Sequence, residues 1–284
     1  MISLGDIRFG PAGFPDAARG KLSRVFESLN EVGLDALEYA AVYGLRLGES
    51  RAREIGQLAK SHKIIMSMHE AYYISLISKD VQVRKRSKSR LVKALKYAPL
   101  MGVTRIVFHV GGYSGFNQEE AYRVVKKALQ DVWEKAGDLG EGAILFPEVA
   151  GKLGAFGSVE ELAQLCNEID GTLPTIDWAH LYARSQGEIG DKDSYLSVIG
   201  EFEDALGRPF TDNMHFHVSG VNYTEKGEKS HRPLGEEWGP DILPLMEIVS
   251  EVGYKPTFIS ETPSPMRGAL YAKALYEELE KVKG

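Results

Sequence analysis

The chain has 284 residues, of which 43% are hydrophobic and 26% are charged, and its formal net charge is −6. This composition predicts a globular protein large enough for one barrel-sized domain, and the acidic balance argues against a nucleic-acid binder with the usual basic surface. The single cysteine, Cys166, excludes an intrachain disulfide and favours a reducing compartment.

The start of the chain, MISLGDIRFGPAG, lacks the basic and apolar segments of a secretory signal. No window reaches the roughly 18 apolar residues that a membrane-spanning helix needs. We therefore expect a cytoplasmic protein without a membrane partner, and we expect it to be a monomer.

Short apolar or β-branched runs alternate with longer amphipathic stretches along the whole chain. The eight expected strands are IRFG from Ile7, LDALEYA from Leu34, KIIMSMH from Lys63, RIVFHVG from Arg105, AILFPEV from Ala143, LPTIDWAH from Leu173, NMHFHVSG from Asn213 and KPTFISET from Lys255. Eight strand–helix units predict an α/β fold, a single TIM (β/α)8 barrel domain over residues 1–284, with a doubly wound open sheet as the alternative. The longest stretch without clear periodicity, Ser219 to Gly239, is expected to be a functional loop.

Side chains of metal-ligand types lie at the expected C-terminal ends of six successive strands, where TIM barrels place their active sites. They are His69, His109, Glu148, Asp177, His180, His217 and Glu261. Ionisable groups that meet at one barrel mouth repel or dehydrate one another unless a divalent cation compensates. Because histidines and carboxylates occur without cysteine, the set suits Zn²⁺, with Mn²⁺ or Fe²⁺ as alternatives.

The seventh expected strand carries two histidines, His215 and His217, which share a face because they are two residues apart. His217 is nearer the mouth and is the expected ligand. His215 lies one layer deeper, either as a partner that supports the ligands or as a plain core histidine. His62 precedes a strand at the opposite end of the barrel and is expected to be structural.

The motifs around these residues resemble the endonuclease IV family, the zinc-dependent apurinic/apyrimidinic endonucleases of the xylose isomerase-like TIM barrel superfamily. The matching stretches are HEAYYISL from His69, FHVG around His109, PEVAGKLGAFG after Glu148, IDWAHLYA, HVSG at His217, HRPLGE from His231 and SETPSP around Glu261. The resemblance covers nearly the whole chain. It implies a DNA-repair enzyme that hydrolyses the phosphodiester on the 5′ side of an abasic site in double-stranded DNA.

The resemblance also implies a trinuclear zinc site and assigns its ligands. The first zinc would be held by His69, His109 and Glu148, the second by Glu148 as a bridge with Asp177, His217 and Glu261, and the third by His180 and His231. Glu148 and Glu261 would be catalytic, and Glu261 would help to orient or deprotonate the nucleophile. Three zinc ions outweigh these carboxylates, so the site would attract a phosphodiester even on an acidic protein.

The sequence departs from the family at Lys229, where the family carries an aspartate that completes the third zinc site. An ammonium group beside zinc is electrostatically unfavourable, so we expect Lys229 to point elsewhere, for instance to a DNA phosphate. Glu228 or water would then fill the gap. On this basis the third ion is predicted to bind more weakly than the other two.

Two aromatic residues, Tyr72 and Tyr73, stand where the family probes the minor groove of DNA, and they would either stack on exposed bases or pack on the barrel rim. Arg46 would enter DNA from the opposite rim. The basic segment RKRSKSRLVKALK is interpreted as the solvated outer face of a helix.

Two other functions remain open on the sequence. A sugar isomerase or epimerase of the same superfamily would need one divalent cation, for which Glu148, Asp177, His217 and Glu261 would suffice. A lesion-binding protein that has lost catalysis is the other alternative. The four further histidines favour the multi-zinc phosphodiesterase, because a one-metal sugar enzyme does not need them.

Overall fold

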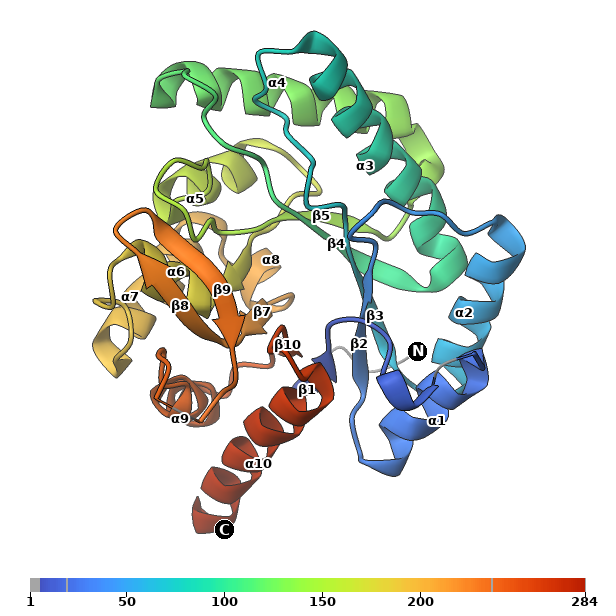
Figure 1. Ribbon diagram of the computed structural model, residues 1–284, viewed down its shortest axis with the longest axis vertical. Coiled ribbons are helices and arrows are strands. Elements are labelled where there is room, and N and C mark those ends of the chain that lie inside the picture. Colours follow the sequence, from blue (N-terminus) through green and yellow to red (C-terminus); the bar gives the residue numbers. More distant parts are fainter. Residues whose placement is uncertain (1–5, 19, 236, 284) are drawn as a thin grey trace.

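The computed structural model describes residues 6–18, 20–235 and 237–283. Strands and helices alternate along most of the chain, as Figure 1 shows. The strands are β1 (Arg8–Pro11), β2 (Ala36–Ala40), β3 (Ile65–His69), β4 (Val103–Phe108), β5 (Ile144–Pro147), β6 (Thr175–Asp177), β7 (His215–Val218), β8 (Gly220–Thr224), β9 (Gly227–Arg232) and β10 (Thr257–Ser260). The α-helices are α1 (Leu22–Glu31), α2 (Glu49–Ser61), α3 (Val81–Met101), α4 (Gln118–Ala136), α5 (Val159–Glu168), α6 (Trp178–Arg184), α7 (Lys192–Leu206), α8 (Arg208–Thr211), α9 (Leu243–Val252) and α10 (Pro265–Lys283), and short 3-10 turns lie at Asp16–Ala18 and Gly137–Gly140. The alternation is interrupted where α6, α7 and α8 and then β7, β8 and β9 follow one another.

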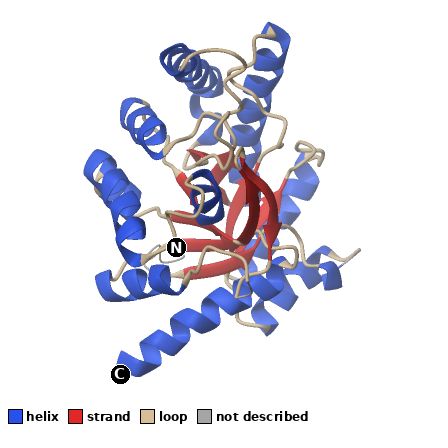
Figure 2. Ribbon diagram, turned by 60° about the vertical axis from the view of Figure 1, so that its left-hand side comes forward, coloured by secondary structure: helices blue, strands red, loops and turns tan. Residues whose placement is uncertain are grey.

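All strands except β8 and β9 are parallel and together form a closed barrel. One hydrogen-bonded sheet has the order β1–β10–β7–β6 and the other the order β2–β3–β4–β5. Bridges between Ala12 and Glu38 and between Glu148 and Thr175 join the two sheets at their seams. Figure 2 shows the strands at the centre with helices around them. The expected fold class, an α/β TIM barrel, is therefore confirmed.

The strands are apolar because helices cover the outside of the barrel and side chains fill its inside. Phe9 of β1 and Phe258 of β10 stack with their ring centroids 5.3 Å apart. Strands β1 and β2 approach so closely that a Cβ at Gly10 would lie 2.0 Å from the carbonyl oxygen of Ala36. Glycine is thus required where this seam of the barrel closes.

Two sequence-based assignments were wrong in detail. The stretch from Ser219 to Gly239 is not simply a loop, because β8 and β9 pair there as an antiparallel hairpin that packs beside α6. Strand β9 is polar and mostly half-buried, and β8 has only two buried residues at its start, so neither shows the apolar run by which the barrel strands were recognised. In the sixth expected strand only Thr175–Asp177 is extended, since Asp177 caps α6 and the chain becomes helical at Trp178.

The single cysteine, Cys166, is buried in α5. Glycines in the left-handed conformation end α3 and α9, at Gly102 and Gly253. In the described part of the chain, none of the helices is both long and apolar enough to cross a membrane.

Candidate metal centre

The C-terminal ends of the parallel strands bring the expected ligands to one mouth of the barrel. His69 ends β3, Asp177 ends β6 and His217 lies in β7, while His109, Glu148 and Glu261 directly follow β4, β5 and β10. His180 lies in the first turn of α6, where its backbone N–H donates to Oδ1 of Asp177 over 2.7 Å. His231 comes from the hairpin strand β9, whose motif HRPLGE ends at Glu236, outside the described residues.

Glu148 is the centre of this group and is fully buried. Its Oε2 lies 3.1 Å from Nε2 of His69 and 3.2 Å from Nδ1 of His109. Its Oε1 lies 3.1 Å from Nδ1 of His217 and 3.4 Å from Nδ1 of His180. The two oxygens thus face different pairs of imidazoles, which is the geometry that a carboxylate bridging two cations requires.

A second set of donors meets beside Glu148. Ligand atoms of Glu148, Asp177, His217 and Glu261 all lie within 4.8 Å of one another. Nδ1 of His217 is 3.5 Å from Oε1 of Glu261 and 4.0 Å from Oδ2 of Asp177. That Asp177 oxygen is buried and has no hydrogen-bond partner among the described residues. A buried carboxylate oxygen without a partner is costly, and a metal ion would satisfy it.

The orientation of His69 also suits a metal ligand. Its Nδ1 lies 2.8 Å from the carbonyl oxygen of Glu70, so Nδ1 carries the proton in the neutral ring. Nε2 then presents its lone pair to Glu148, an acceptor facing an acceptor. A cation or an extra proton must lie between them, and histidine ligands of metals commonly hold this backbone contact.

The ionisable residues of the site shift one another's pKa values strongly. Burial raises the pKa of Glu148, but the charges of His109 and His217 and the hydrogen bonds of nearby imidazoles bring it well below its usual range. Burial lowers the pKa of His69, but its hydrogen bond to Glu148 and that residue's charge outweigh burial and raise it to about 9. Extra protons on histidine thus supply positive charge that a divalent cation would otherwise provide. The donors, nitrogen and carboxylate oxygen without sulfur, fit Zn²⁺, Mn²⁺ or Fe²⁺.

Sequence reasoning missed Glu38, a fully buried carboxylate in β2. Its Oε1 lies 3.1 Å from Nε2 of His217, and its Oε2 lies 3.0 Å from Nε2 of His215 and accepts a hydrogen bond from Ser67 Oγ at 2.8 Å. His217 therefore points Nδ1 at the metal-ligand group and Nε2 at Glu38, although Nε2 of His217 and Oε1 of Glu38 make no hydrogen bond within the described residues. His215 contacts the same carboxylate through its Nε2, and Glu38, His215 and His217 form a candidate ligand group of their own. The available signal was an acidic residue inside the apolar run LDALEYA.

The rim residues that were expected to contact DNA are exposed. Tyr72 is 63% exposed and Tyr73 is 39% exposed, and their rings meet edge to face. The guanidinium of Arg46 lies 5.9 Å from the ring centre of Tyr43, and Lys229 is exposed on β9. None of these four side chains belongs to the buried donor group.

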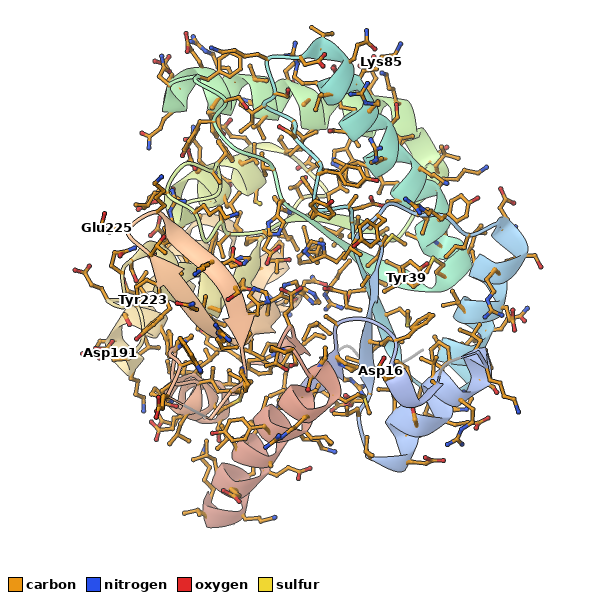
Figure 3. The ribbon with its side chains drawn as sticks, in the orientation of Figure 1. Asp16, Tyr39, Lys85, Asp191, Tyr223 and Glu225 are labelled. Carbon is orange, nitrogen blue, oxygen red and sulfur yellow. The ribbon has the colours of Figure 1, made fainter. Side chains whose placement is uncertain are left out.

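A groove of about 600 Å³ lies beside this aromatic rim. Its basic and aromatic lining includes Tyr43, Arg46, Tyr73, Lys85, Arg86, Arg90 and Lys93. Arg90 stacks over Tyr73, with its guanidinium carbon 4.7 Å from the ring centre. Figure 3 shows Lys85 at the outer side of α3. Lys85, Arg86 and Lys93 of the segment RKRSKSRLVKALK are exposed, and this solvated face also lines the groove.

A closed parallel barrel with histidines and carboxylates converging on its mouth defines a TIM barrel protein with a candidate metal centre. Residues 26–280 match the xylose isomerase-like TIM barrel family, and the chain belongs to this family. It is 31% identical over 271 residues to an uncharacterized protein of Methanocaldococcus jannaschii, covering 95% of this chain and 97% of that protein. It is 23% identical to the probable endonuclease 4 of Persephonella marina, covering 76% of this chain and 78% of that one.

Solved structures of two kinds resemble the fold. Endonuclease IV from Thermus thermophilus superimposes with a TM-score of 0.75 and 20% identity, covering 96% of this chain and 99% of that chain. A D-tagatose 3-epimerase-like protein superimposes with a TM-score of 0.72 and 19% identity, covering 97% and 98%. At these identities the likeness establishes the shared fold.

Proposed function

We propose that this chain is a DNA-repair endonuclease that uses a multinuclear metal centre to hydrolyse the phosphodiester 5′ to an abasic site. Zinc is the proposed metal. The observation that carries the proposal is the surplus of donors. Glu148, Asp177, His217 and Glu261 would already hold one cation. The additional His69 and His109 meet the other oxygen of Glu148, which makes room for a second.

Bound metal ions would polarise the phosphoryl oxygens and bring the pKa of water close to neutrality. The protein's own part is to place the donors and to handle the proton. Burial raises the pKa of Glu261, which directly follows β10 at the barrel mouth and has a side chain that is 16% exposed. A carboxylate with a raised pKa is better matched to accept a proton from the attacking water near neutral pH. Glu148 contacts His69 and His109 through one carboxylate oxygen and His217 and His180 through the other, and it would thereby keep the metal ligands in place.

The rim supports a DNA substrate. Exposed aromatic rings stack on unpaired or unstacked bases of any sequence, as Tyr72 and Tyr73 would at an abasic site. The arginines and lysines of the adjoining groove would contact phosphates. An acidic chain thereby offers a local basic surface next to the proposed reaction centre. The named endonuclease relatives, at 22–27% identity, support the same conclusion.

A sugar epimerase is the second candidate, because the four-donor set around His217 would serve a one-metal enzyme and because the fold resembles epimerases. A lesion-binding protein without catalysis is the third.

One experiment separates these functions. A duplex with a single abasic site is incubated with metal-loaded protein, with chelator-treated protein and with Glu148→Gln, beside an undamaged duplex. The proposal expects incision of the abasic duplex alone, lost with chelator and with the variant. Binding without incision would identify a lesion-binding protein, and turnover of a ketose without incision would identify an epimerase. Either of these results would overturn the proposal.

A further inference from the structure

The hairpin strand β9 carries His231 and the unusual Lys229. In a regular strand residues two apart share a face, so position 229 would be the natural partner of His231. Lys229 is exposed instead. The residue before it, Glu228, has a half-buried side chain with 22% of its surface exposed.

The pairing of the hairpin explains which residue faces His231. Asn222 of β8 pairs with Ser230, whereas the next residue, Tyr223, pairs with Glu228, so Lys229 is an extra residue in β9. Such a β-bulge interrupts the alternation of the strand and redirects a side chain. Glu228 thereby comes to the side of His231, and Lys229 turns to solvent.

His180 and His231 form a candidate ligand group with Asp177, in which the ligand atoms all lie within 4.8 Å of one another. Glu228 lies beside both histidines and would add a carboxylate to this pair. Its Oε2 lies 3.5 Å from Nε2 of His180, and its Oε1 lies 3.8 Å from Nε2 of His231. Both distances exceed a normal N–H···O hydrogen bond. A tetrahedral zinc with bonds of about 2.0–2.2 Å would hold its donors roughly 3.2–3.6 Å apart. The contact to His180 lies within this range, and the contact to His231 is slightly longer.

The protons of the two imidazoles point away from Glu228. Nδ1 of His231 lies 2.9 Å from the carbonyl oxygen of Glu261. Nδ1 of His180 lies 3.1 Å from the carbonyl oxygen of Val149 and 3.4 Å from Oε1 of Glu148, which are both acceptors. In the neutral rings both Nδ1 atoms therefore carry the proton, and both Nε2 atoms present lone pairs to a carboxylate. Nε2 of His231 is buried and has no hydrogen-bond partner among the described residues.

The backbone holds this arrangement in place. The N–H of Glu228 donates to the carbonyl oxygen of Gly151, in the loop after β5, over 2.9 Å. A Cβ at Gly151 would lie 2.7 Å from Cβ of Glu228 and 2.9 Å from Cδ2 of His180. The absence of a side chain at Gly151 thus lets the two donors approach each other.

We propose that Glu228, His180 and His231 form a complete divalent-cation site in which the bulge at Lys229 lets Glu228 supply the missing carboxylate. This inference rests on the proposed multinuclear centre but not on its substrate. It replaces the expectation of a weakly held third ion. A zinc ion in this site would be held by three protein donors.

The test is a zinc count at buffered free zinc by native mass spectrometry, with cobalt(II) absorption as a second readout. Glu228→Gln removes the carboxylate charge but keeps the side-chain size. The matched control is Glu225→Gln, which removes an exposed carboxylate from the turn of the same hairpin, at the outer edge of the molecule (Figure 3). Unfolding temperatures of the metal-free proteins verify that each variant folds.

We expect wild type and Glu225→Gln to bind one more zinc than Glu228→Gln at the same free zinc. Loss of a hydrogen-bond partner behind a metal ligand weakens metal binding by up to about 100-fold. Loss of Glu228, a direct ligand in this proposal, should therefore lower the affinity for that ion by at least as much. Equal counts and affinities in wild type and Glu228→Gln would overturn the inference. If Glu228→Gln loses one ion but wild type does not cleave abasic DNA, the metal site stands and the proposed function fails.

Discussion

Replacing Glu38 by glutamine tests how the barrel interior positions His217. Glu38 accepts from Ser67 and lies 3.0–3.1 Å from Nε2 of both His215 and His217. Glutamine keeps the size of the side chain but replaces one acceptor oxygen with an NH2 donor. At least one imidazole nitrogen then faces a donor, and His217 can lose the carboxylate oxygen that lies 3.1 Å from its Nε2, opposite the Nδ1 that faces Glu148 and Glu261.

The magnitude follows from these contacts. A buried donor left without an acceptor costs about 1–3 kcal/mol. For a protein of this size, each kcal/mol lowers the unfolding temperature by roughly 2–4 °C. Loss of a hydrogen-bond partner behind a metal ligand typically weakens metal binding about 10–100-fold.

The assay is a competition titration of zinc against a chromophoric chelator, with thermal unfolding of the metal-free protein in parallel. Ser67→Ala is the matched control, because it removes one hydrogen bond to Glu38 and leaves both imidazole contacts; we expect it to change zinc affinity less than about tenfold. If Glu38→Gln folds and binds zinc as tightly as wild type, Glu38 does not position His217 and the reasoning is refuted.

Two further predictions concern protons and DNA. In the metal-free protein the pKa of His69 is raised to about 9, so the stabilisation from its protonated pair with Glu148 is complete below pH 6.5 and is lost as the pH rises through about 9. Because zinc must displace that proton, calorimetry at pH 7 in buffers of different ionisation enthalpy should show proton release on zinc binding. Zinc affinity should rise with pH up to about 9, and an affinity that does not depend on pH would contradict this prediction. Tyr72→Ala should weaken binding to an abasic duplex roughly 5- to 100-fold without changing the zinc count, and an unchanged affinity in a fluorescence anisotropy titration would show that Tyr72 does not stack on bases.

The barrel could be predicted from the sequence because its strands are buried on both faces. Runs such as RIVFHVG stand out from the amphipathic helices, and a parallel barrel brings all strand C-termini to one end. His69, His109 and Glu148 lie 70 or more positions from the hairpin, yet their place at strand ends was enough to group them.

The parts that escaped prediction depend on geometry that residue types do not encode. Glu38 lies within an apolar strand, and the pattern alone does not say which face looks into the barrel. The orientation of Glu228 results from a one-residue bulge, which changes the facing of a side chain without altering the sequence pattern. The hairpin itself was missed because half-exposed strands carry mixed polar residues.

The central claim is that the mouth of this barrel holds more than one metal ion. Native mass spectrometry of the intact protein, purified without chelator and equilibrated with zinc, counts the bound ions directly. The account predicts three zinc ions per chain at saturation, and a single ion that persists at all zinc concentrations would contradict it.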